Sequence, residues 1–188
     1  MMMNSEKGFT LIEMIMSLVL LGIVGVFSSL FFVKGIEGYI FADLNASMAQ
    51  QAQYAFTRLI LEFENLTDIT PPLTSNAIVY QMQPASNIPI VTRSIGFIGN
   101  ELKLNVNGSN PAQGNIILNN LSSFTIACYK DFPNNILWAT GEPIQDLLAI
   151  QITIVFNRSD LPPDVQTFTT IINPRRNKGY NAPVNWNI

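Results

Sequence analysis

The stretch Phe9–Val33 decides the fold of the N-terminal part of this chain and reads FTLIEMIMSLVLLGIVGVFSSLFFV. Nearly all of its 25 residues are apolar or small. About 20 apolar helical residues are enough to cross the hydrocarbon core of a bilayer, so the run predicts a transmembrane helix. Glu13 is its only ionisable side chain. A carboxylate inside such a helix costs ~2.5–3.5 kcal/mol on insertion scales, which makes Glu13 a candidate functional residue.

The eight residues before this run, MMMNSEKG, form a short polar segment. A secretory signal peptide would carry an apolar core of about 7–15 residues followed by a small-residue cleavage site. The run Phe9–Val33 is longer than that, and no such site follows it. We therefore expect the run to remain in the protein as a membrane segment.

Composition narrows the classes of function. Only 12% of the residues are charged, 48% are hydrophobic, and the formal net charge is −3, which favours a folded chain without an electrostatic attraction to nucleic acid. Histidine is absent and Cys128 is the single cysteine. These counts argue against His-based catalysis, an intrachain disulfide and Cys- or His-rich metal sites. We predict that the protein is not an enzyme, and we expect no cofactor and no metal.

The helix is predicted to continue to about Asn65, because no proline occurs before Pro71. Residues 34–66 are amphipathic, with apolar side chains three and four positions apart. These apolar positions are Ile36, Ile40, Leu44, Met48, Ala52, Ala55, Phe56, Leu59, Ile60, Phe63 and Leu66. The polar face carries Lys34, Glu37, Asp43, Asn45, Gln50, Gln53, Thr57, Arg58 and Glu62. We expect the apolar face to pack on the domain that follows; the alternative is a groove for a partner.

The prolines of Thr70-Pro71-Pro72 end the helical region, and we place the helix-to-sheet boundary at Thr67–Ser75. Residues 76–173 consist of short β-rich runs with turn residues between them. The predicted strands are Ile78–Gln83, Arg93–Ile98, Glu101–Val106, Asn115–Leu118, Ser123–Tyr129, Leu148–Phe156 and Val165–Ile172. Gly99-Asn100 is a two-residue hairpin signal.

Alternation along two of these strands identifies buried positions. Ile150, Ile152, Ile154 and Phe156 form a fully apolar face, so their strand is expected to be central. Phe124, Ile126 and Cys128 alternate with the residues between them, so Cys128 is expected to be a buried small side chain rather than a reactive thiol. The sequence thus predicts an α+β fold. A long N-terminal transmembrane and amphipathic helix packs on a C-terminal antiparallel β-sheet domain, with an irregular tail at 174–188.

The acidic residues of the β-rich region are scattered and lack metal-ligand spacing. The segment Asp160-Leu-Pro-Pro-Asp164 could form half of a calcium loop, but its prolines favour a solvent-exposed turn. The glycines do not form a phosphate-binding motif.

The arrangement Lys7-Gly8-Phe9-Thr10-Leu11-Ile12-Glu13, followed by the apolar run, resembles the processing and methylation motif of type IV pilins and type II secretion pseudopilins. The resemblance implies that a prepilin peptidase cuts between Gly8 and Phe9 on the cytoplasmic side and then methylates Phe9. Residues 1–8 would be the leader peptide, and 188 − 8 = 180 residues would remain.

The cut would create a cationic amine on Phe9, one helical turn from Glu13 and on the same face. An amine and a carboxylate about 4 Å apart attract by up to ~4 kcal/mol at an effective dielectric near 20, which offsets the burial of Glu13. If the amine belongs to a neighbouring subunit, the same attraction sets the axial register of a filament. Glu13 is therefore the predicted assembly and register residue.

The order of later features is similar to that of the J-type minor pseudopilin of type II secretion. The similar features are Arg58-Leu59, the strand ending in Cys128-Tyr129, Trp138, the Ile-rich strand Leu148–Phe156 and the closing strand before Pro174-Arg175. This resemblance implies a structural subunit, a minor pseudopilin, at or near the tip of a type II secretion pseudopilus. The alternatives are a minor pilin of a type IV pilus and a membrane-anchored periplasmic binding domain that does not polymerise.

The resemblance also implies partners and location. The expected partners are the prepilin peptidase, other minor and major pseudopilins or pilins, the inner-membrane assembly platform and the membrane, but no nucleic acid. The chain would cross the inner membrane once, with its C-terminal domain in the periplasm, and would enter a periplasm-spanning filament.

Overall fold

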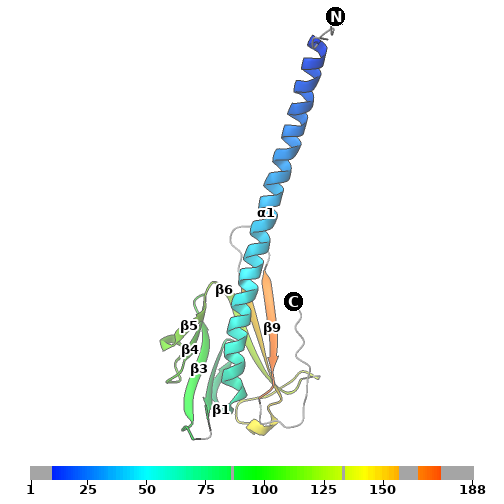
Figure 1. Cartoon of the computed structure of the whole chain (residues 1–188). Helices are drawn as coiled ribbons and strands as arrows, with labels where there is room; N and C mark the ends of the chain where they lie inside the picture. Colours follow the sequence, from blue (N-terminus) through cyan, green and yellow to red (C-terminus); the bar gives the residue numbers. More distant parts are fainter. Residues whose placement is uncertain (1–9, 86, 133, 157–164, 175–188) are drawn as a thin grey trace, which may run out of the picture. The chain divides into compact units, whose positions relative to one another are not determined.

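The computed structural model describes residues 10–85, 87–132, 134–156 and 165–174. The chain divides into two compact units, Met1–Ser47 and Met48–Ile188. One helix, α1 (Leu11–Glu64), runs through both units, and the described strands all belong to the second unit (Figure 1). The predicted α+β fold, a long apolar N-terminal helix with antiparallel sheets, is confirmed.

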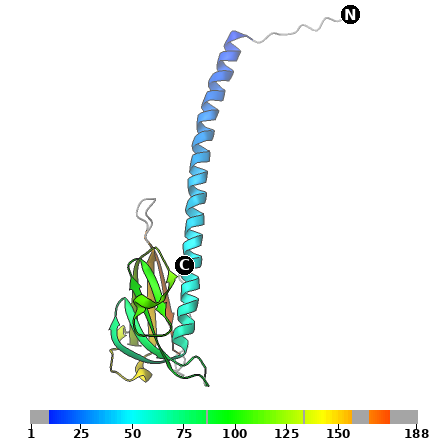
Figure 2. The same ribbon diagram turned by 90° about the vertical axis from the view of Figure 1, so that its left-hand side faces the viewer.

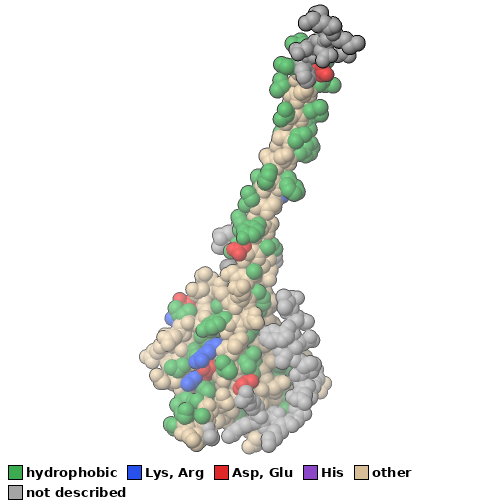
Figure 3. Space-filling view, in the orientation of Figure 1, with side chains coloured by type: hydrophobic (Ala, Val, Ile, Leu, Met, Phe, Trp, Pro, Cys, Tyr) green, Lys and Arg blue, Asp and Glu red, His purple; other side chains and the backbone are tan. Residues whose placement is uncertain are grey.

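In the unit Met1–Ser47 the described residues from Leu11 onward are helical, and apolar side chains cover the helix on the face seen in Figure 3. Phe31, for example, is 79% exposed. Within the described residues, this is the one helix that is long and apolar enough to cross a membrane. Ile36, Ile40 and Leu44 were expected to pack in the core, but they are exposed. The reason is that the described part of their unit contains no second element against which they could pack.

Two antiparallel sheets complete the second unit, and both lie on the same side of the C-terminal part of α1 (Figure 2). One sheet has the order β1 (Leu66–Thr74), β2 (Ala77–Met82), β3 (Val91–Ile98), β4 (Glu101–Asn105) and β5 (Asn115–Leu118). The other has the order β7 (Ile136–Leu137), β6 (Leu121–Asp131), β8 (Ala149–Phe156) and β9 (Gln166–Ile172).

Two strands differ from the sequence prediction. The sequence indicated only a helix-to-sheet boundary at Thr67–Ser75, because Pro71 and Pro72 disfavour a strand. The structure has the strand β1 there. β1 is an edge strand, where prolines are tolerated, and its register with β2 shifts between Thr70 and Thr74. β7 has only two residues, too few for any alternation to show in the sequence.

The core forms between the C-terminal part of α1 and the inner faces of both sheets. Phe56, Leu59 and Phe63 of α1 are at most 4% exposed. The predicted apolar face of β8 is buried, and β8 lies between β6 and β9 as expected. Cys128 is also buried, at 2% exposure. These contacts hold the last turns of α1 against the strands and fix the side chains that extend from them.

Candidate functional site

The start of α1 carries the first candidate site. The Glu13 backbone N–H donates to Thr10 Oγ1 over 3.4 Å, and the Thr10 N–H donates to Glu13 Oε2 over 3.3 Å. The Thr10 hydroxyl also donates to Glu13 Oε2 over 3.2 Å. This reciprocal pattern is a capping box, in which an N-cap threonine and a glutamate three residues later satisfy free helix N–H groups. Thr10 and Glu13 therefore fix where the helix begins.

Sequence reasoning assigned Glu13 to assembly and missed this local role, although the spacing Thr-x-x-Glu is its sequence signal. Gly8 and Phe9, the predicted cleavage and methylation residues, lie outside the described residues. The expected pairing of Glu13 with the Phe9 amine therefore stays a prediction. Within the described residues, the hydrogen bonds to the Glu13 carboxylate all end on Oε2, and the side chain is exposed.

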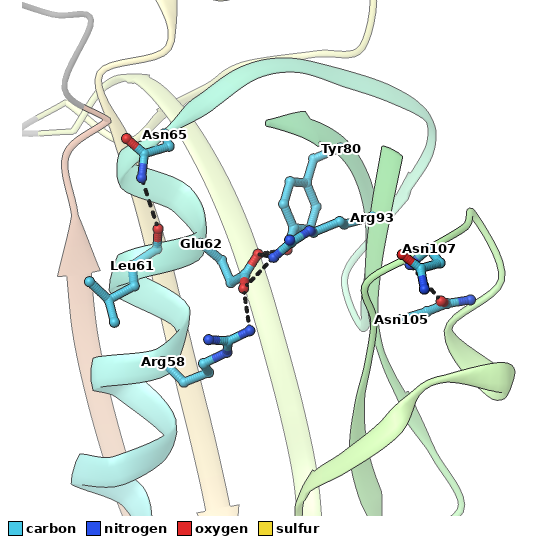
Figure 4. A network of polar contacts seen from close by, with 8 residues as sticks. All are labelled: Arg58, Leu61, Glu62, Asn65, Tyr80, Arg93, Asn105 and Asn107. Atoms are coloured by element: carbon cyan, nitrogen blue, oxygen red, sulfur yellow. Dashed lines mark hydrogen bonds and ion pairs between the residues drawn. The ribbon is translucent and has the colours of Figure 1, made fainter. Parts of the chain in front are cut away.

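A second polar site lies at the other end of α1, around Glu62 (Figure 4). Glu62 was expected on the polar face of the helix, opposite the face that packs on the domain, but it is buried, with only 2% exposure. Arg93 Nη1 of β3 lies 2.8 Å from each carboxylate oxygen, and Arg58 Nη2 lies 2.8 Å from Oε1. The Tyr80 hydroxyl of β2 donates to Oε2 over 2.9 Å. We call these four residues the Glu62 cluster.

The geometry of the cluster follows from neighbouring elements. Arg58 and Glu62 are one helical turn apart on α1, and Tyr80 and Arg93 are direct partners in the β2–β3 ladder. The Tyr80 ring packs against Phe63 with ring centroids 5.2 Å apart. Burial, and then the Glu62 charge, raise the pKa of Tyr80 well above 10, so the hydroxyl remains a donor. The cluster thus joins helix and sheet through a buried charge that has three donors.

Other titratable groups have ordinary structural explanations. Burial raises the pKa of Cys128 to about 12, which keeps the thiol protonated and unreactive near neutral pH. Glu142 accepts from Lys130 Nζ at 2.6 Å and from the Ala139 N–H at 3.0 Å, and these bonds lower the pKa of Glu142. Cys128 is thus a core side chain of β6, and Glu142 connects its loop to Lys130 of β6.

Little in the described residues points to a bound small molecule or metal. A groove of about 410 Å³ lies between Gln50, Gln51 and Tyr54 of α1 and residues 116–119 at β5. No carboxylate, imidazole or thiol lines it. Among the described residues, no three His, Cys, Asp or Glu side chains are close enough to hold a metal ion. The possible calcium segment Asp160–Asp164 lies outside the described residues.

Comparison with known proteins finds a family motif at the N-terminal end of the chain. Residues 3–29 match the prokaryotic N-terminal methylation motif, a match that includes Gly8, Phe9 and Glu13. No curated protein and no solved structure shows significant similarity to the chain. The motif and the α+β layout support a type IV pilin-like protein, a class whose members are typically structural rather than enzymatic. The motif implies processing by a prepilin peptidase and assembly with other pilins.

Proposed function

We propose that this chain is a structural subunit of a type II secretion pseudopilus, a minor pseudopilin at or near the filament tip. The observation that carries the proposal is the methylation motif at residues 3–29, which precedes and includes the start of a long apolar helix. In this proposal the cleaved junction is Gly8-Phe9, which precedes the start of α1 at Leu11 in the sequence.

The geometry at Glu13 supports an assembly role. The Thr10 bonds orient the carboxylate at the first turn of α1, and they leave Oε1 without a described donor. In the processed protein the Phe9 amine, from the same chain or a neighbour, would supply a charged donor. Pairing between chains would set the register of adjacent subunits, because the apolar interior of a membrane or filament would strengthen the attraction between the two charges.

The outer face of the sheet β7-β6-β8-β9 supports a role among other subunits. Three rows that cross β6, β8 and β9 contain no charged side chain; Asp131, which pairs with Ile136, lies at the β7 end of the sheet. These rows are Ser123-Val155-Thr167, Thr125-Thr153-Thr169 and Ala127-Gln151-Ile171. Covering such a face removes no ion from water, and protein interfaces are depleted in charged residues at their centres. Assignment to type II secretion and to the tip rests on the similarity to the J-type minor pseudopilin in the order of later features.

In this proposal the prepilin peptidase removes residues 1–8 and methylates Phe9. The chain waits in the inner membrane with its C-terminal domain in the periplasm, and then the assembly platform adds it to other minor and major pseudopilins. A minor pilin of a type IV pilus would be processed in the same way. Deletion of the gene separates the two, since a pseudopilin mutant loses protein secretion and a minor-pilin mutant loses surface pili.

The test is the intact mass of the chain extracted from cells that contain the peptidase. We expect loss of Met1–Gly8, addition of one methyl group, and co-purification with other pilin-like subunits. Gly8→Val should block the cut, because a branched side chain replaces a hydrogen at the scissile bond. An uncut wild-type chain would overturn the proposal. A cut chain that captures no other subunit would favour an anchored binding domain that does not polymerise.

A further inference from the structure

The charges of the Glu62 cluster do not balance. Arg58 and Arg93 carry two positive charges and Glu62 carries one negative charge, which leaves +2 − 1 = +1. Tyr80 adds no charge because its hydroxyl stays protonated. In the described part of the chain, both arginines form ion pairs with Glu62 alone. The Glu62 carboxylate is therefore the counter-charge of two guanidinium groups.

The cluster also has more donors than acceptors. A guanidinium group has five N–H donors, but Arg93 contacts Glu62 through Nη1 and Arg58 contacts it through Nη2. Arg93 Nε is fully buried and has no partner in the described residues. Glu62 already accepts from Arg58, Arg93 and Tyr80, so it cannot readily supply the missing acceptors. A second anion at the exposed edge of the cluster would supply acceptors for the remaining Nη groups of the two arginines, whereas the buried Arg93 Nε lies out of its reach.

The surplus charge can be reached from solvent. The side chain of Arg58 is 42% exposed and that of Arg93 is 17% exposed, whereas Glu62 is enclosed beneath them. In Figure 3, blue Lys and Arg side chains gather beside a red one on the visible face of the second unit. An incoming group would meet Arg58 first and Arg93 behind it.

We propose that Arg58 and Arg93 form a binding site for a carboxylate on an acidic side chain of a neighbouring subunit. A planar guanidinium group matches a carboxylate in geometry and forms charge-assisted hydrogen bonds with it. An acidic protein side chain fits better than an anionic lipid surface. The site offers one net charge rather than a basic cluster, and the chain as a whole carries −3. The proposal rests on the proposed function, because it requires neighbouring subunits.

The first test measures capture of the co-expressed pilin-like subunits by the full chain in detergent. Arg58→Gln removes one positive charge but leaves Glu62 bonded to Arg93 and Tyr80, so the fold should persist, which protease resistance checks. Lys103→Gln is the matched control, since Lys103 pairs with Glu101 elsewhere on the sheet. We expect Arg58→Gln to reduce capture about fivefold at low salt, and Lys103→Gln to leave it unchanged. Equal capture of subunits by both variants would overturn the proposal that Arg58 and Arg93 form a binding site.

The second test identifies the partner chemistry. In an Arg58→Lys chain assembled in membranes, a carbodiimide can join the new amine directly to a carboxylate in contact with it. An amide bond to an aspartate or glutamate of another subunit is the expected product. Bonding to Glu62 alone would overturn the proposal. A second result would also overturn the proposal: Arg58→Gln loses binding to anionic lipid vesicles but captures the other subunits as well as the wild type does. That result would assign the site to lipid. Leader cleavage and wild-type capture report separately on the proposed function, and a wild-type chain that captures no subunit would overturn both proposals.

Discussion

Arg93 Nη1 lies 2.8 Å from both carboxylate oxygens of Glu62, although the two residues are 31 positions apart in the chain. This ion pair connects the last turns of α1 to β3. The Tyr80 hydroxyl donates a hydrogen bond to the same carboxylate and so connects it to β2. Burial of a carboxylate without partners costs a large free energy. The buried position of Glu62 therefore requires its arginine and tyrosine partners.

Loss of Glu62 should therefore destabilise the domain. We expect Glu62→Ala to lower the free energy of unfolding by about 3–5 kcal/mol, because it leaves two neighbouring guanidinium groups without a counter-charge. Urea unfolding of the fragment Lys34–Ile188 would measure the change; we expect this fragment to fold alone with more strand than helix. Glu37→Ala is the control, since Glu37 forms an exposed pair with Lys34. A Glu62→Ala midpoint equal to that of the control would contradict the prediction.

The apolar face of α1 gives a second prediction. Phe56 is 4% exposed, so Phe56→Asp would bury an unpaired carboxylate and remove an aromatic ring from the core. We expect a loss of at least about 3 kcal/mol in unfolding free energy. Tyr54→Asp makes a similar change two residues away at 70% exposure and should cost far less. Thermal melts followed by circular dichroism would compare them, and similar melting of both variants would show that Phe56 does not face the core.

The two roles of Glu13 can be separated by a third experiment. Thr10→Val removes the capping hydroxyl and keeps the carboxylate, whereas Glu13→Val removes both the capping acceptor and the charge. We expect both variants to be cleaved at Gly8-Phe9 and to reach the membrane. If Glu13 sets the register, only Glu13→Val should strongly reduce co-purification with other subunits and crosslinking near residue 13. Equal losses in both variants would indicate that Glu13 acts only as a helix cap.

Alkaline pH should destabilise the domain. The pKa of Cys128 is raised from 9.0 to about 12 in the folded state. Between these values the unfolded thiol loses its proton and the folded thiol keeps it. The unfolded state then binds fewer protons, and stability falls as pH rises, by up to about 1.4 kcal/mol per pH unit. The loss should begin near pH 9 and be complete near pH 12.

Cys128→Ala removes this titration and should flatten the curve between about pH 9 and 10. Above pH 10 the raised pKa of Tyr80 adds a loss of the same sign in both proteins. Urea unfolding at a series of pH values would test this, with unfolding free energies referred to each protein's value near pH 7. Identical slopes for wild type and Cys128→Ala between pH 9 and 10 would show that the thiol does not contribute.

Local sequence patterns were enough for the features that depend on neighbours along the chain. The apolar run Phe9–Val33 predicts a spanning helix because its length matches a bilayer. The alternation of Ile150, Ile152 and Ile154 predicts a buried central strand because strand side chains alternate between faces. The junction Gly8-Phe9 with Glu13 indicated a prepilin because that motif is contiguous, and residues 3–29 match it.

Only the tertiary structure decided the environment of Glu62. Helical spacing places this residue beside Arg58 on a polar stripe, and the neighbouring sequence does not indicate that Glu62 is buried. It is buried because β2 and β3 bring Tyr80 and Arg93 to the same point, and the donors of those strands replace the water that the carboxylate loses. The exposure of Ile36 and Ile40 has the complementary cause: their spacing is that of a core face, but burial requires a packing surface, and spacing along one helix does not contain that information.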